Sequence, residues 1–112
     1  MNEEMNRIEL AFEEGDTCLA GYPYGEKIFK DQVDGKLDRQ QVNMIIFPDQ
    51  IEQVAISFTQ GFFKGILEEE DKQPKIKSDN PDEEDMFIVI LKAKDKELTN
   101  KIINDLKNME NP

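Results

Sequence analysis

Residues 57–67 decide the fold, and they read Ser57-Phe58-Thr59-Gln60-Gly61-Phe62-Phe63-Lys64-Gly65-Ile66-Leu67. At about 100° per residue, the large apolar side chains of this stretch fill one half of a helical wheel. Ser57 and Gln60 have the form of a capping box, so we expect a helix to begin at Ser57. Gly61 and Gly65 should each cost about 1 kcal/mol relative to alanine. We therefore expect these two glycines to press the helix backbone tightly against a sheet.

Outside this helix the sequence predicts strands. Residues 44–47 and 86–91 are uninterrupted apolar runs. Such runs are typical of strands covered on both faces, in a parallel sheet with helices on each side. Residues 7–12 alternate polar and apolar, which predicts a strand with one exposed face. A short extended piece is expected over 17–20.

Two more helices are predicted. Pro23 suits the first turn of a helix whose apolar stripe is Ile28, Phe29, Val33 and Leu37, and which we expect to end before Arg39. Asp95 can cap a last helix with a stripe at Leu98, Ile102, Leu106 and Met109. Strands and helices thus alternate. We expect an α/β fold with a small, mainly parallel or mixed sheet in βαβαβα order.

Length and composition predict one domain spanning residues 1–112. No apolar run approaches the roughly 18 residues needed to span a membrane, and the first residues do not have the order of a signal peptide. The single cysteine, Cys18, fits a reducing compartment, and we expect it to be a small buried apolar residue. These observations favour the cytoplasm.

The net charge of −11 argues against direct binding to nucleic acid or to an anionic membrane. A basic protein partner, or solubility alone, fits the sign better. Much of the charge falls in residues 68–85, where nine acids meet three bases around Pro74 and Pro81. This composition predicts a mobile acidic loop at 70–85.

Catalysis is not expected. The chain has no histidine, which removes the usual general base near neutral pH and the commonest zinc ligand. No glycine-rich loop that would hold a phosphate or a dinucleotide is present. The acidic run 79–85 lacks the glycine and the ligand alternation of a calcium loop. We therefore predict no enzyme activity, no cofactor and no metal site.

The stretch from Val42 to Leu67 resembles the bacterial STAS-like domains of unknown function. In that family an apolar strand precedes a Ser/Pro-Phe element that opens a helix containing glycine or alanine, as in Val54-Ala55-Ile56-Ser57-Phe58-Thr59-Gln60-Gly61-Phe62-Phe63. Residues 18–29 look like the first helix of the same family. Together these segments cover about half of the chain. The acidic insertion departs from the family pattern.

The resemblance implies a fold similar to the anti-sigma-factor antagonists, which bind a kinase-type partner and are switched by serine phosphorylation. The switch serine of those proteins matches Ser57, with Thr59 nearby, but the usual Asp-Ser pair is missing here. As a plain alternative, Ser57 only caps its helix.

The leading hypothesis is a non-catalytic regulatory domain that binds a protein, such as a histidine-kinase-type ATPase or another regulator. The residues proposed to meet the partner are Asp49, Gln50, Glu52, Gln53, Ser57 and Thr59. Two alternatives stay open. One is an acidic inhibitor that mimics nucleic acid and occupies a DNA-binding enzyme, and the other is an enzyme that uses carboxylates alone.

Overall fold

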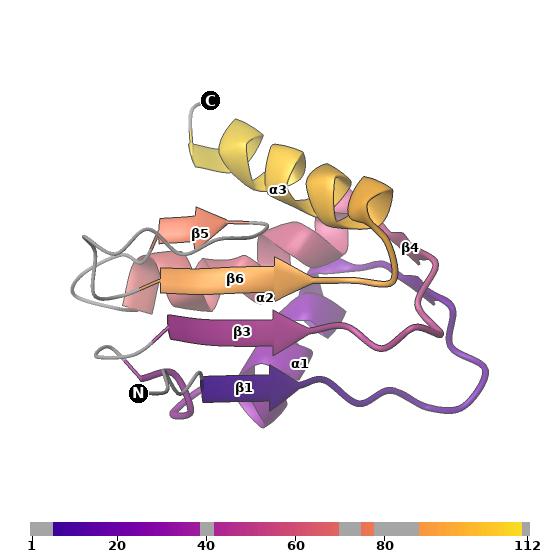
Figure 1. Cartoon of the computed structure of the whole chain (residues 1–112), viewed down its shortest axis with the longest axis horizontal. Coiled ribbons are helices and arrows are strands. Elements are labelled where there is room, and N and C mark those ends of the chain that lie inside the picture. The colour runs from indigo at the N-terminus through magenta and orange to yellow at the C-terminus, as the bar shows by residue number, and fades with distance from the viewer. Residues whose placement is uncertain (1–5, 39–41, 70–74, 78–87, 111–112) are drawn as a thin grey trace, which may run out of the picture.

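The molecule is built on a four-stranded parallel sheet (Figure 1). The computed structural model describes residues 6–38, 42–69, 75–77 and 88–110. In spatial order the strands are β1 (Asn6–Glu9), β3 (Val42–Ile46), β6 (Ile88–Lys92) and β5 (Lys75–Lys77). The strands expected around residues 7–12, 44–47 and 86–91 therefore exist, and Met86 and Phe87 lie outside the described residues.

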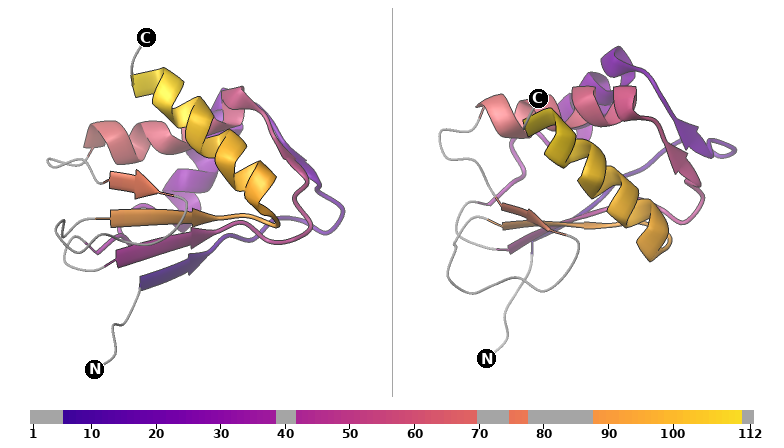
Figure 2. Two further views of the ribbon diagram at one scale, coloured as in Figure 1. Left: turned by 45° about the horizontal axis from the view of Figure 1, so that its top comes forward. Right: turned by 90° about the horizontal axis from the view of Figure 1, so that it is seen from above.

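Two helices lie on one face of this sheet, and a third runs diagonally beside its β5 edge (Figure 2). The two are α1 (Tyr22–Gln32) and α2 (Ile56–Glu69), and the third is α3 (Lys96–Glu110). Within the described residues no helix covers the opposite face, although Ile88–Leu91 of β6 are all buried. The expectation of helices on both faces is therefore wrong for the described residues, and β3 shows why. Its residues Asn43 and Ile45 are buried under the helices, whereas Val42, Met44 and Ile46 alternate with them and are only half-buried. An apolar run can thus form a strand with one well-covered face.

A second, two-stranded sheet joins the carboxyl ends of the large sheet to the helices. It pairs β2 (Cys18–Leu19) with β4 (Gln53–Val54) in parallel. With β2, β4 and β5 included, the chain is an α/β protein with parallel sheets, but its element order is not the expected βαβαβα. Cys18 is exposed, which contradicts the expectation of a buried residue.

The predicted acidic loop at 70–85 contains a strand. Lys75–Lys77 form β5 and pair in parallel with β6, because Ile76 supplies an apolar side chain that packs against the core. Composition alone gave no signal for so short an element. The other residues of that segment lie outside the described residues.

Helix α1 ends at Gln32, well before the expected end near Arg39. Gly35 has a φ of +85°, a left-handed conformation that breaks the helix and that glycine adopts without strain. Val33 is fully buried beyond the helix end, so the apolar stripe continues into the core without helical structure.

Helix α3 begins as predicted. The backbone N–H of Leu98 donates a hydrogen bond to the Asp95 carboxylate at 2.9 Å, which confirms the cap. Leu98, Ile102 and Leu106 are buried in the hydrophobic core. The side chain of Met109 lies outside the described residues.

The core contains a cluster of phenylalanines from α1, from α2 and from the position directly after β3. The ring of Phe62 lies 4.8 Å from Phe63, 5.6 Å from Phe58 and 6.0 Å from Phe47, centroid to centroid. Phe29 of α1 meets Phe62 edge-on at 6.2 Å. These packed rings join α2 to α1 through Phe29 and to the end of β3 through Phe47.

Candidate functional site

Helices α1 and α2 touch backbone to backbone. A Cβ atom on Gly61 would overlap the carbonyl oxygen of Tyr22, and one on Gly25 would overlap the backbone of α2 at Phe58 and Phe62. The glycines of α2 therefore face α1, and the prediction that they press the helix onto the sheet is wrong. The phenylalanines occupy the sheet-facing side, which leaves the glycine side for the neighbouring helix.

Gly65 belongs to the same contact, although it meets a side chain. A Cβ atom there would run into the ring of Phe29. Beside these glycines, a groove of about 360 Å³ opens between the two helices on their solvent side. Charged side chains of both signs border it, including Glu26 and Lys30 of α1 and Lys64 of α2.

A hydrogen bond joins the first turns of α1 and α2. The N–H of Gly21 donates to the Ser57 hydroxyl at 2.9 Å. Because α2 already begins at Ile56, Ser57 lies inside the first turn of that helix. Its hydroxyl accepts a hydrogen bond from the residue before α1 and does not cap α2. The expected capping box with Gln60 is therefore not formed. Gly21 itself has a φ of +106°, which lets the chain turn from β2 into α1.

Two large apolar side chains are exposed beside this joint. Tyr22 is 36% exposed and Ile56 is 43% exposed, and they are the large hydrophobic residues that the described part of the chain leaves open to solvent. Each is the first residue of its helix. The ammonium group of Lys64 lies 5.8 Å from the centre of the Tyr22 ring, a cation–π distance.

The loop that follows β3 packs against the turn that follows β1. The Gln50 side-chain amide donates to the carbonyl oxygens of Glu13 at 2.8 Å and Asp16 at 2.9 Å. The backbone N–H groups of Glu52 and Gln53 both donate to the carbonyl oxygen of Thr17, at 2.7 and 3.1 Å. These bonds bring two acidic loops together at the carboxyl ends of the strands.

The two loops form an acidic rim, made of Glu13, Glu14, Asp16, Asp49 and Glu52. Its negative field reaches the start of α1. The pKa of Tyr24 is raised, first because its phenol is partly desolvated and next because Asp16 and Glu13 disfavour the phenolate. The acidic rim and the helix starts are thus neighbouring parts of one end of the molecule, and we call them together the helix-start surface.

The six residues predicted to meet a partner fall in three places. Asp49, Gln50, Glu52 and Gln53 are exposed on the helix-start surface. Ser57 is half-buried in the joint between the helices. Thr59 is fully buried in the core, and its hydroxyl has no hydrogen-bond partner. Sequence reasoning missed Tyr22 and Ile56, whose only signal was their place just before a predicted helix.

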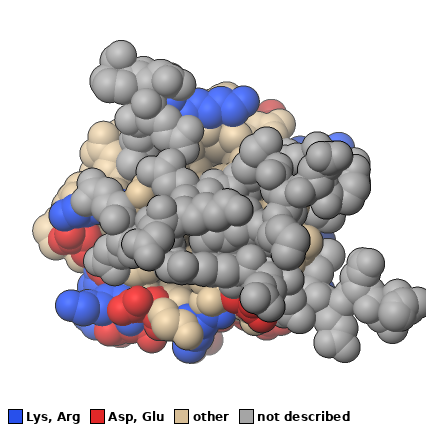
Figure 3. All heavy atoms as spheres, turned by 90° about the vertical axis from the view of Figure 1, so that its left-hand side faces the viewer, with Lys and Arg blue, Asp and Glu red and all other residues tan. Residues whose placement is uncertain are grey.

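At the opposite end of the molecule the strands of the sheet begin (Figure 1). Figure 3 shows this end, with basic and acidic side chains close together at its lower corner, among the residues that the structure describes. Within the described ranges no three cysteine or acidic side chains come together as metal ligands. No helix in those ranges is both long and apolar enough to cross a membrane.

No family model, characterised protein or solved structure matches this chain. The site is therefore interpreted from its own geometry.

Proposed function

We propose that this chain is a non-catalytic regulatory domain of the bacterial cytoplasm that binds a protein partner through its helix-start surface. The observation that carries the proposal is that Tyr22 and Ile56 are exposed apolar residues and that each is adjacent in the chain to one partner of the Gly21–Ser57 hydrogen bond. Exposed aromatic and aliphatic residues framed by polar groups are the usual centre of a protein interface.

The acidic rim indicates the chemistry of the partner. A complementary surface would place an apolar patch against Tyr22 and Ile56 and basic side chains against Asp49 and Glu52. Opposite charges at the edge of an interface mainly steer association and are weakened by salt. A kinase-type ATPase or a similar regulator is the partner that the STAS-like resemblance suggests.

The proposal does not depend on a phosphoryl switch. The Ser57 hydroxyl accepts the hydrogen bond from Gly21, and Thr59 is buried. A phosphate on Ser57 would have to displace the first turn of α1. Binding is therefore assigned to the surface itself.

The nucleic-acid mimic rests on charges that lie mostly beyond the described residues. The described residues contain 16 of the 25 acids and 12 of the 14 bases, a net charge of −4 out of −11. Of the nine acids in the run that motivated this alternative, Glu68 and Glu69 lie in the described ranges. We propose protein binding alone.

An affinity capture from bacterial lysate tests the proposal. The immobilised chain should retain a stoichiometric protein whose recovery falls as salt rises. The variant Tyr22→Ser/Ile56→Ser should lose that protein, whereas Asn100→Ser/Asn104→Ser, on the exposed side of α3, should keep it. Capture of no stoichiometric protein at any salt concentration, or equal capture by both variants, would contradict the proposed function.

A further inference from the structure

The free edge of β1 exposes backbone hydrogen-bonding groups. β1 is the first strand of the sheet, with β3 as its neighbour on one side (Figure 1). The N–H of Leu10 donates to the Ile46 carbonyl at 2.9 Å, so the even-numbered residues direct their N–H and C=O groups toward β3. The odd-numbered residues Arg7 and Glu9 consequently direct theirs outward. The described residues donate no hydrogen bond to these groups and accept none.

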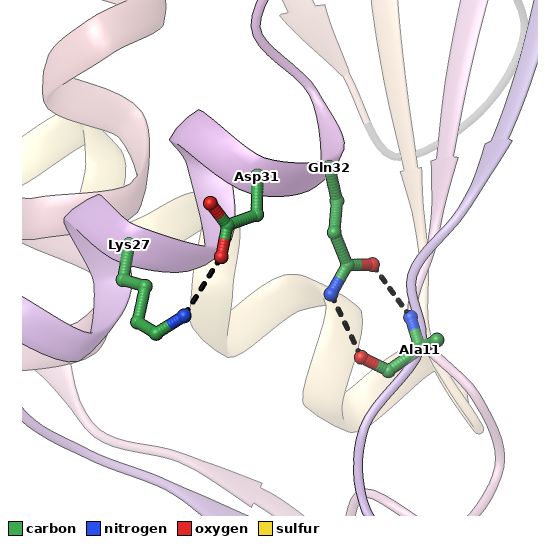
Figure 4. A network of polar contacts seen from close by, with 4 residues as sticks. All are labelled: Ala11, Lys27, Asp31 and Gln32. Carbon is green, nitrogen blue, oxygen red and sulfur yellow. Dashed lines mark hydrogen bonds and ion pairs between the residues drawn. The ribbon is translucent and has the colours of Figure 1, made fainter.

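One side chain closes this edge just beyond Glu9. Ala11 is the next odd-numbered residue, and the Gln32 amide satisfies both of its outward groups (Figure 4). The Ala11 N–H donates to Gln32 Oε1 at 2.7 Å, and Gln32 Nε2 donates to the Ala11 carbonyl at 2.8 Å. Gln32 thus makes the two bonds that a neighbouring strand would make. The open part of the edge is limited to Arg7–Glu9.

A groove of about 380 Å³ lies along this open edge. Residues 6–9 form one wall, and Gln32 and Lys36 form the other. The Asn6 side chain donates to the Lys36 carbonyl at 2.7 Å, so the turn after α1 follows the strand on its helix side. A second copy of the chain that paired with this edge would bring its own α1 and the turn after it to the side already occupied by Gln32 and Lys36. An extended peptide has no attached helix and avoids this overlap.

We propose that the β1 edge binds an extended peptide segment of a partner protein as an additional, antiparallel strand. Antiparallel pairing is the more stable kind, and residues opposite Arg7 and Glu9 would each exchange both backbone hydrogen bonds with them. This surface is separate from the helix-start surface and does not rest on the proposed function.

Charge complementarity specifies the peptide. Arg7 and Glu9 are exposed on the same face of β1, two residues apart, with Ile8 buried between them on the other face. Directly opposite residues share a face, and opposite charges there attract. Read from its amino end, the bound segment therefore places a basic residue opposite Glu9, an apolar residue opposite Ile8 and an acidic residue opposite Arg7.

Two end-blocked peptides of equal composition test the proposal, Thr-Lys-Val-Glu-Thr and Thr-Glu-Val-Lys-Thr. Titration into the labelled protein, followed by NMR, should shift the amide signals of Arg7 and Glu9 with the first peptide. The second should bind roughly tenfold more weakly because both cross-strand pairs become repulsive. The protein variant Arg7→Glu/Glu9→Arg should reverse this preference. Methylating the Lys and Glu amide nitrogens of the first peptide should abolish binding, while methylating the Val nitrogen should not.

Several results would overturn this inference. They are no shift with either peptide up to millimolar concentration, equal binding of the two peptides, and binding that survives methylation at Lys and Glu. A fourth is self-association of the protein, seen by sedimentation and lost in Arg7→Glu, which would make a second copy the occupant. A melting temperature equal to that of the parent establishes that each variant is folded.

Discussion

The α1–α2 contact and the β1 edge are both places where backbone packs against another part of the chain, and they differ in what makes the contact. At Gly61 and Gly25 the two helix backbones touch with no side chain between them. At Ala11 the backbone is completed by the long side chain of Gln32. The first contact should tolerate no added atom, whereas the second should depend on the chemistry of one amide.

Gly61→Val should produce the largest loss of stability. The Cβ atom of the valine would overlap the carbonyl oxygen of Tyr22, which is part of a helix backbone and cannot rotate away. We expect the free energy of unfolding to fall by at least about 3 kcal/mol, enough to unfold much of the protein. Urea denaturation followed by circular dichroism measures it.

Gly65→Ala is the matched control for that variant, because the added methyl group meets the Phe29 ring and not backbone. A ring can shift, so the loss should be smaller, about 1–2 kcal/mol. An equal loss in the two variants would mean that the glycines do not mark a backbone contact between α1 and α2.

The sequence predicted that α2 is a helix and that its glycines mark a close approach, but it predicted the wrong neighbour, a sheet in place of helix α1. The apolar half of the wheel in 57–67 is wide enough to contact both a sheet and another helix, and periodicity does not distinguish these neighbours. Gly25 was the missing half of the signal. A glycine in the first turn of α1 gains meaning only once α1 and α2 are placed side by side.

Gln32→Ala tests the second kind of contact. It removes two hydrogen bonds and leaves the outward N–H and C=O of Ala11 exposed at the strand edge, where water can bind them. The expected loss is about 1–2 kcal/mol, measured by urea denaturation. Gln32→Glu keeps the acceptor for the Ala11 N–H but turns an oxygen toward the Ala11 carbonyl, so it should be no more stable than the alanine variant. A glutamate variant as stable as the parent would show that this amide does not complete the strand.

Ser57→Ala should cost less, about 1 kcal/mol, because it removes one hydrogen bond from the Gly21 N–H at a half-buried position. Gln60→Ala separates this interpretation from the capping box that the sequence suggested. A capping box requires both side chains, so both variants would lose stability. The structure predicts that only the serine variant does, as thermal unfolding can measure.

The candidate site was predictable in part for a similar reason. Asp49, Gln50, Glu52 and Gln53 follow a recognisable strand, and a loop at the carboxyl end of a parallel strand is exposed in most folds. Thr59 was misplaced because of its hydroxyl, although it lies about 100° from Phe58 on the helical wheel, within the apolar half that is buried. Tyr22 and Ile56 lie 34 positions apart, and the tertiary contacts bring their helices together: the pairing of β2 with β4 and the backbone contact between α1 and α2.

The smallest expected effect concerns the ionisation of Tyr24, which reports how close the acidic rim lies to the start of α1. The variant Tyr22→Phe leaves Tyr24 as the one tyrosine of the chain. Its phenol should then titrate, by ultraviolet absorbance, above the ordinary pKa of 10.0. Asp16→Asn should lower that pKa toward the ordinary value, because it removes a negative charge that disfavours the phenolate, while Glu97→Gln on α3 should not.

The sign of the linked stability follows from the same shift. The folded state holds the neutral phenol more firmly than the unfolded chain does, so its contribution is complete below pH 10.0 and is lost as the pH rises through the folded pKa. Because desolvation is the larger cause, Asp16→Asn should remove only part of the shift. A pKa in the folded protein at or below the ordinary value would separate the acidic rim from the start of α1, and with it the helix-start surface as one continuous patch.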